Sequence, residues 1–181
     1  MKRDWITFFS QTGSEITNIS AFYKTVPKCI AHNKKHFERV NPWIKQQMGK
    51  QTTRFVQLPP KPTVDDYLAV LKEYKNPLIT LHGYLRIIPK EICEKYEIYN
   101  LHPGLITKYP DLKGKDPQDR AFQKQYETAG CVIHRVIPEV DSGEIMLEHE
   151  INIRYKDLDR VYAELHALAS AMWIKFFKQY V

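Results

Sequence analysis

The sequence predicts an α/β protein whose sheet is mostly parallel, with mixed strand pairing toward one edge and helices on both faces. Through the first half of the chain, short apolar runs alternate with segments whose apolar residues recur at helical spacing, the pattern of successive β-α-β units. Later, two runs of alternating polarity, Cys131–Val136 and Ile145–Ile151, follow one another without a helix between them. The first observation indicates parallel strands, and the second indicates the mixed edge.

The expected strands of the parallel part are short, apolar and bounded by turn-forming residues. They are Trp5–Ser10, Lys28–Ala31, Arg54–Leu58, Pro77–His82 and Ile98–Leu101. The turn after the first of them contains Gly13, and the fourth breaks at Gly83.

Helices are expected between these strands and at the carboxyl end, over about residues 16–23, 41–50, 63–74, 89–95, 118–126 and 157–180. Pro42 suits a first helical position, and Thr63 is a typical N-cap with acids in the turn that follows. One face of the last helix is apolar and consists of Leu158, Val161, Leu165, Leu168, Met172 and Phe176. Residues 108–117 are expected to form a long polar loop.

The composition is that of an ordinary globular protein. The chain has 181 residues, of which 43% are hydrophobic and 27% charged, and we expect one domain spanning residues 1–181. No apolar run approaches the about 20 residues that span a bilayer, and the first residues lack a signal peptide's apolar segment. We therefore expect a cytoplasmic protein with no membrane partner. The three cysteines, Cys29, Cys93 and Cys131, are widely spaced, so we expect buried thiols.

The net charge is +6. Such a charge attracts anions, either nucleic acid or a phosphorylated small molecule. No basic helix and no RNA-binding aromatic signature accompanies it, so we expect a solvated basic face and no nucleic-acid partner.

A ligand site is expected beyond the carboxyl ends of the parallel strands, where open α/β sheets bind their ligands. Four segments would line that edge. They are Ser10–Glu15, His82–Ile88, Asn100–Leu105 and Val136–Gly143.

The third of these segments carries the most informative pair of side chains. Asn100 and His102 are two residues apart in an extended run, so both can face one pocket. An amide that donates to a developing oxyanion, beside an imidazole, suits acyl-transfer chemistry. Taken alone, the pair is equally well explained as a structural feature of the strand end. Asp141, in the turn between the last two strands, is in the same way either functional or an ordinary turn acid.

The turn Ser10–Glu15 offers a second candidate site. A glycine lets backbone amides face an anion, and the dipole of the following helix adds to the attraction. The alternative is a plain turn in which Ser14 caps the helix. Glu15 suits the helix dipole but would repel a phosphate close to it.

Three other kinds of site are not supported. The histidines lack metal-ligand spacing, so we expect no metal. No Gly-x-Ser-x-Gly elbow is present, and no cysteine lies at a strand–turn–helix junction. A dinucleotide-dependent dehydrogenase would need Gly-x-Gly-x-x-Gly after the first strand, where this chain has one glycine.

Taken together, three segments resemble the folate-dependent formyltransferases. They are His82–Pro89, Asn100–Pro110 and His134–Gly143, and their order and spacing are most similar to the glycinamide ribonucleotide formyltransferases of purine biosynthesis. The resemblance covers nearly the whole chain and implies a Rossmann-like formyltransferase fold.

The resemblance implies that a formyl group passes from 10-formyltetrahydrofolate, the co-substrate, to a primary amine. Asn100, His102 and Asp141 match the catalytic residues, and His134 matches a histidine beside them. By the same comparison, Asp141 would favour charged His102 and relay the amine's proton. The pterin would be bound by backbone around residues 86–88 and 140–141, between apolar walls. The residues implied on the donor side are Leu85, Arg86, Ile87, Ile88, Val136, Val140 and Asp141.

On the acceptor side, Gly13, Ser14 and Glu15 fall where the family holds the acceptor's phosphate. Glu15 replaces an Asn of the family, Lys113–Gln118 replaces a His-bearing loop, and Leu165 and Ser142 are further departures. Glycinamide ribonucleotide is the expected acceptor, because the chain ends soon after the catalytic region. An amino sugar linked to a nucleotide is the alternative acceptor. A non-catalytic binding module is disfavoured by the complete set Asn100, His102 and Asp141. A monomer and a homodimer both remain open.

Overall fold

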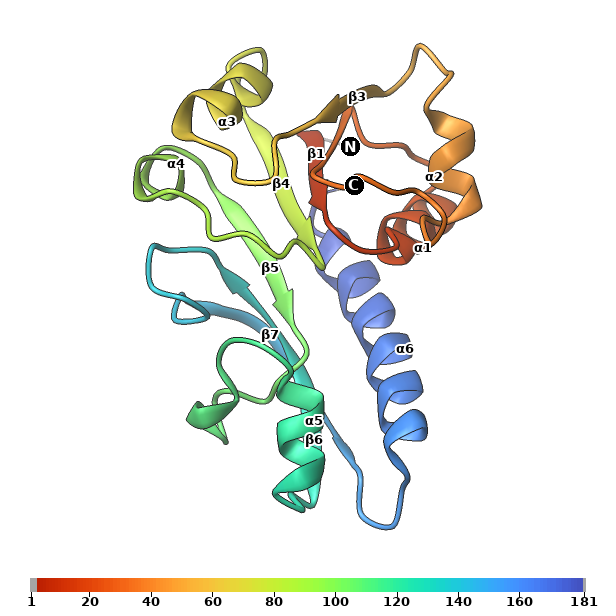
Figure 1. The fold of residues 1–181 in the computed structure, drawn as a ribbon, viewed down its shortest axis with the longest axis vertical. Coiled ribbons are helices and arrows are strands. Elements are labelled where there is room, and N and C mark those ends of the chain that lie inside the picture. Colours follow the sequence, from red (N-terminus) through yellow and green to blue (C-terminus); the bar gives the residue numbers. More distant parts are fainter. Residues whose placement is uncertain (1–2, 181) are drawn as a thin grey trace.

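The computed structural model describes residues 3–180 and contains one seven-stranded sheet with the strand order β3-β2-β1-β4-β5-β6-β7 (Figure 1). The strands are β1 (Asp4–Phe9), β2 (Cys29–His32), β3 (Arg54–Gln57), β4 (Pro77–His82), β5 (Ile98–His102), β6 (Thr128–Arg135) and β7 (Ile145–Asn152). The helices are α1 (Ser14–Tyr23), α2 (Pro42–Gln47), α3 (Val64–Leu71), α4 (Lys90–Lys95), α5 (Pro117–Gln123) and α6 (Leu158–Phe177).

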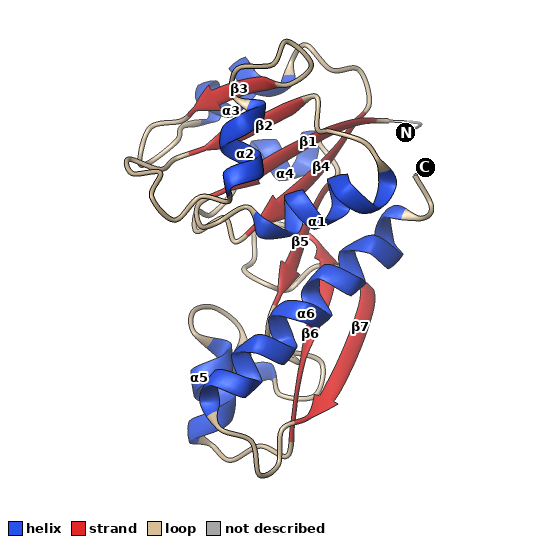
Figure 2. Ribbon diagram, turned by 90° about the vertical axis from the view of Figure 1, so that its right-hand side faces the viewer, coloured by secondary structure: helices blue, strands red, loops and turns tan. Residues whose placement is uncertain are grey.

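The pairing of the strands confirms the predicted mixed sheet. β1 to β5 pair in parallel, whereas β6 pairs antiparallel with β5 and with β7. The two antiparallel strands, with α5 and one half of α6, extend beyond the parallel part of the sheet (Figure 2). The carboxyl end of β5 therefore lies at the junction of the parallel and antiparallel parts.

Local capping explains where several helices begin. The Asn41 side chain accepts the Trp43 amide, with Pro42 at the first helical position. Thr63 and Asp66 form a reciprocal capping box at the start of α3. At α1 the N-cap is Gly13, in the left-handed region with φ 72°, so Ser14 begins the helix instead of capping it.

Two main cores lie on opposite faces of the sheet. One is beneath α1, α2 and α6, and the other is beneath α3 and α4 (Figure 1). Four of the six residues predicted for the apolar face of α6, Val161, Leu165, Met172 and Phe176, are buried, but the buried face is centred slightly to one side of the predicted one. Leu158 and Leu168 are only half-buried, while Trp173 and Phe177 are fully buried. The aromatic side chains bury more area than the leucines, and this determines which face of α6 turns toward the sheet.

Other expectations concern smaller features. The segment expected as a polar loop contains a short 3₁₀ turn, Pro110–Leu112. Cys29, Cys93 and Cys131 are free and buried, as predicted. No helix within residues 3–180 combines the length and apolarity that crossing a bilayer requires.

Candidate active site

The alternation of β5 places Asn100 and His102 on the sheet face opposite α6. Their neighbours Tyr99 and Leu101 pack into the core beneath α6. The antiparallel register sets Asn100 opposite His134 of β6, and the Asn100 Nδ2–His134 Nε2 distance is 3.4 Å. The predicted shared direction of Asn100 and His102 is therefore present, and pairing with β6 adds His134 beside them.

Asp141 reaches this group from the connection between β6 and β7. One of its oxygens, Oδ2, is 3.3 Å from His102 Nδ1, and the other, Oδ1, is 3.3 Å from His134 Nε2. Asp141 has φ 49°, a left-handed conformation that aspartate tolerates better than most residues. Gly143 is required in the same turn, because a Cβ there would lie 1.9 Å from the Arg135 carbonyl oxygen. The backbone of this turn thus presents one carboxylate to two imidazoles.

The electrostatics of this group combine two opposing influences on His102: burial disfavours the charged imidazole, and Asp141 favours it, as expected. Burial lowers the pKa of His102, and although the Asp141 carboxylate opposes this, burial outweighs it. Burial raises the pKa of Asp141, but hydrogen bonding with His134, the nearby His102 and the Gly114 amide bring it below its ordinary value. These shifts favour a neutral His102 imidazole and an ionised Asp141 carboxylate.

In this conformation the remaining nitrogen of each imidazole faces a backbone carbonyl. His102 Nε2 is 2.8 Å from the Leu112 oxygen, and His134 Nδ1 is 2.9 Å from the Arg135 oxygen. His102 is only 5% exposed, and its contact with Leu112 places the end of the 3₁₀ turn against the ring. Gly114, which follows this turn, donates its backbone amide to Asp141 Oδ2 at 2.9 Å and so holds the loop against the site.

The residues implied on the donor side lie along the turns that follow β4 and β6. Leu85, Ile87 and Val140 have exposed side chains, whereas that of Ile88 is buried and that of Val136 half-buried against the core beneath α3 and α4. The guanidinium of Arg86 is also held, by the Pro60 and Leu85 carbonyls. Ile88 and Arg86 can therefore serve a ligand through backbone groups more readily than through side chains.

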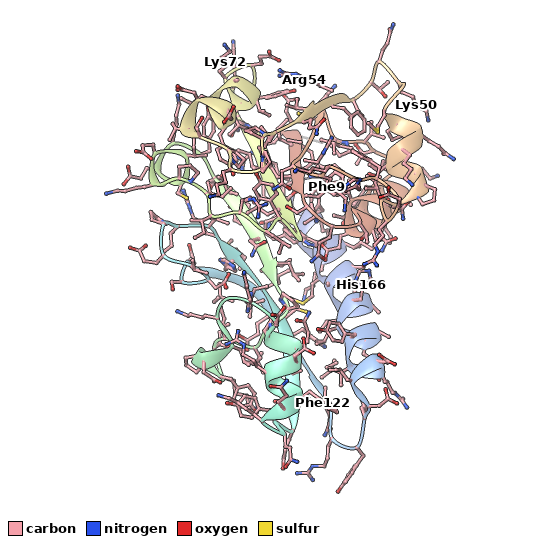
Figure 3. The ribbon with its side chains drawn as sticks, in the orientation of Figure 1. Phe9, Lys50, Arg54, Lys72, Phe122 and His166 are labelled. Atoms are coloured by element: carbon pink, nitrogen blue, oxygen red, sulfur yellow. The ribbon has the colours of Figure 1, made fainter. Side chains whose placement is uncertain are left out.

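The residues implied on the acceptor side line a cleft of about 130 Å³ between the start of α1 and α6. Gly13, Ser14 and Glu15 form one wall, and Leu101 and Pro103 connect it to the end of β5. His166 of α6, labelled in Figure 3, lines the opposite wall. The cleft thus adjoins the strand end that carries His102.

Sequence reasoning missed a hydrogen-bonded network in the wall of this cleft. Glu15 Oε2 is 2.8 Å from His82 Nδ1 and accepts the Trp173 indole N–H at 2.8 Å. The side chains of His82 and Glu15 are 1% and 16% exposed. Only the position of His82 at a strand end indicated a role, and nothing in the spacing connected it with Glu15 or Trp173.

Two further observations concern other places in the described part of the chain. Among residues 3–180, no group of three or more His, Cys, Asp and Glu side chains has the arrangement of a metal site. A larger surface hollow, of about 510 Å³, lies at the amino ends of β1 and β4, around Arg3 and Pro77. It lies at the opposite edge from the side chains just described.

Comparison with known proteins agrees with this architecture. The family model described as "Formyl transferase" matches residues 15–176. The chain is 35% identical over 96 residues to a phosphoribosylglycinamide formyltransferase of Dictyostelium discoideum, covering 46% of this chain and 45% of that protein. It is 31% identical over 108 residues to a methionyl-tRNA formyltransferase of Thermotoga neapolitana, covering 58% of this chain and 34% of that protein.

Among solved structures, a phosphoribosylglycinamide formyltransferase of Campylobacter jejuni has the same fold, with a TM-score of 0.80 at 22% identity. That superposition covers 98% of this chain and 99% of the other. The alignments with the two curated relatives span less than two thirds of each relative's own length. Because the family model spans most of the chain and ends within α6, we conclude that this chain belongs to the formyl transferase family.

Proposed function

We propose that this protein transfers a formyl group from 10-formyltetrahydrofolate to a primary amine. The observation that supports this most directly is the meeting of Asn100, His102, His134 and Asp141 at the carboxyl end of β5 in a member of the formyl transferase family. These groups supply an oxyanion donor and a proton acceptor at one place.

The reaction needs those two functions. The amine nitrogen attacks the formyl carbon, a C–N bond forms, and the carbonyl oxygen becomes an oxyanion. The ammonium proton must leave, and N10 of the folate must receive a proton as its bond to the formyl carbon breaks. The products are the N-formyl amine and tetrahydrofolate. No covalent enzyme intermediate is needed.

In our proposal Asn100 donates its amide N–H to the oxyanion, and His102 carries the proton. A neutral imidazole is a ready base, whereas the lowered pKa of Asp141 makes its carboxylate a poor one. Asp141 then stabilises the imidazolium that forms, at the 3.3 Å separation from Nδ1. His134 donates from Nε2 to Asp141 Oδ1 and so holds the carboxylate from the other side, next to Asn100.

The Leu112 carbonyl must move for this chemistry to occur, because it faces His102 Nε2. With that contact exchanged for substrate, Nδ1 can donate to Asp141 and Nε2 can face the amine. The donor's pterin would be bound by the backbone at Arg86, Ile87, Ile88, Val140 and Asp141, with Leu85 and Val136 as apolar walls. These positions follow from the family resemblance.

Two acceptors remain candidates. Glycinamide ribonucleotide is supported by the names of several relatives, which are phosphoribosylglycinamide formyltransferases. An amine rich in hydroxyl groups, such as a nucleotide-linked amino sugar, is favoured by the Glu15 carboxylate in the cleft. We further propose that residues 1–181 act as one catalytic domain in the cytoplasm.

The test is to incubate the protein with 10-formyltetrahydrofolate and a panel of amines, and to detect tetrahydrofolate and N-formyl product together. The panel starts with glycinamide ribonucleotide and includes nucleotide-linked amino sugars. Turnover of any of them that depends on His102 supports formyl transfer. Failure of every amine, with a folded protein that does not bind the folate, contradicts it.

A further inference from the structure

The cleft beside the first turn of α1 has an unusual charge for this protein. Its lining contains the carboxylate of Glu15 and no lysine or arginine, although the chain has 27 of these residues and a net charge of +6. Lys50, Arg54 and Lys72 lie at the end of the molecule away from His166, which lines the cleft (Figure 3). The remaining polar lining consists of amide, hydroxyl and imidazole side chains. Its members are Gln11, Thr12, Ser14, His82, Gln118, Tyr162 and His166.

The Glu15 carboxylate is held in place by a directed chain of hydrogen bonds. The Trp5 indole N–H donates to Thr80 Oγ1 at 2.8 Å, and Thr80 Oγ1 is 2.9 Å from His82 Nε2. The Thr80 hydroxyl can in turn donate a hydrogen bond to His82 Nε2, and in that tautomer His82 Nδ1–H donates to Glu15 Oε2. The Trp173 N–H donates to the same oxygen, Oε2. Two donors thus fix the carboxylate before any ligand arrives.

The second oxygen of that carboxylate, Oε1, remains available. It has no hydrogen-bond partner among residues 3–180, and it is not one of the buried unpartnered atoms there, which are Thr7 Oγ1, Ser20 Oγ and Arg120 Nε. Oε1 is therefore accessible at the cleft that Glu15 lines. An ionised carboxylate oxygen accepts hydrogen bonds and offers none.

The start of α1 would by itself attract an anion, because the first amides of a helix have no partner within it. Glu15 already places a negative charge in that first turn. A phosphate arriving there would meet a fixed like charge without a cationic side chain among the residues that line the cleft. A hydroxyl or ammonium group would instead find an oriented acceptor.

We infer that Glu15 is a specificity-determining residue that selects acceptors presenting a hydroxyl or ammonium donor to the first turn of α1, and disfavours those presenting a phosphate. This inference rests on the proposed formyl transfer for the identity of the ligand as an acceptor. The chemical class is a primary amine that carries hydroxyl groups at the end bound beside α1. His82 and Trp173 contribute to this selectivity indirectly, because they position the Glu15 carboxylate.

The test compares two ligands that differ only in the phosphate, glycinamide ribonucleotide and glycinamide riboside. Dissociation constants are measured by calorimetry for the full chain and for Glu15→Gln, without folate. In the wild-type protein we expect the riboside to bind at least about tenfold more tightly, the factor that corresponds to about 1.4 kcal/mol. In Glu15→Gln the ratio of the two dissociation constants, ribonucleotide over riboside, should fall by about tenfold, chiefly because the ribonucleotide binds more tightly.

A matched control is Glu91→Gln, which also removes an acid from a first helical turn, on the exposed surface of α4 outside the cleft. It should leave the ratio unchanged. Trp173→Phe keeps an aromatic ring but removes the donor to Glu15, and it should reduce the discrimination by less than Glu15→Gln does. It also keeps the inference testable if Glu15→Gln does not fold.

Tighter binding of the ribonucleotide by the wild-type protein overturns the inference. The inference is also overturned if the ratio of dissociation constants is the same in Glu15→Gln and Trp173→Phe as in the wild-type protein, or if neither ligand binds. A preference for the riboside that depends on Glu15, in a protein that formylates no amine, would instead contradict the proposed reaction while leaving the selectivity of the cleft established.

Discussion

Asn100 lies directly opposite His134 in the antiparallel β5–β6 pair, and the Asn100 Nδ2–His134 Nε2 distance is 3.4 Å. This relationship fixes the amide of a residue that we propose as the oxyanion donor. His134 in turn contacts the Asp141 carboxylate, which His102 also contacts.

His102→Ala should reduce kcat/KM for formyl transfer by about 10²–10⁴-fold, the usual contribution of a positioned acid–base group. The substitution removes the proposed proton carrier. The control is His36→Ala, whose side chain is 81% exposed and which should keep normal activity. A His102→Ala protein with a normal melting temperature and near-normal turnover would contradict the assignment.

Asn100→Ala should lower kcat by about 10²–10³-fold with a smaller change in KM. The physical reason is that the oxyanion exists only in the transition state, so loss of its donor leaves ground-state binding largely intact. Steady-state kinetics separates the two parameters. Asn100→Asp, which is nearly the same shape, should be at least as inactive, because a carboxylate cannot donate; full activity of this variant would exclude the donor role.

Asp141→Asn should lower the pKa of His102 further. The carboxylate is the main influence that opposes the effect of burial on this imidazole, and the amide removes its charge. The measurement is an NMR titration of the His102 ring in both proteins. Asparagine also tolerates the left-handed conformation at position 141, so the fold should persist. An unchanged or raised pKa would show that the two groups are not coupled in solution.

The stability of the fold should depend on pH through His102. Its folded-state pKa is lowered from the ordinary 6.5, so the unfolded chain binds this proton more readily than the folded one. The free energy of unfolding should therefore decrease as pH falls through about 6.5 and below. His102→Gln should show a smaller decrease between pH 7.5 and 5.5 in urea titrations. An equal decrease in the free energy of unfolding in both proteins would show that groups other than His102 cause the pH dependence.

Gly143→Ala should destabilise the protein by about 1–3 kcal/mol, the usual range for overpacking. The added Cβ would lie 1.9 Å from the Arg135 carbonyl oxygen, and the turn would have to move. Because that turn carries Asp141, activity should fall as well. Gly49→Ala is the matched control, since a Cβ there meets nothing within 4 Å. Similar unfolding free energies for both variants would contradict the close packing of the turn.

Local patterns in the sequence were sufficient for the order of strands and helices and for the mixed edge of the sheet. These depend on short-range physics: the period of apolar residues, capping at Asn41 and Thr63, and breaks at Gly13 and Gly83. The shared direction of Asn100 and His102 belongs to the same class, because alternation in a strand is local. The boundaries were less predictable, as at Ser14, which begins α1 instead of capping it.

Only the tertiary structure could decide which distant side chains meet and in what ionic state. Glu15 contacts His82, 67 residues away, and Trp173, 158 residues away, because β1, β4 and α6 come together around it. The net shift of the His102 pKa likewise depends on burial, which is a property of the packed fold and not of neighbouring residues in the chain. The sequence by itself therefore determined the secondary-structure elements and which chemical groups they carry, whereas the packing decided the partners of those groups, their protonation and the lining of the cleft beside α1.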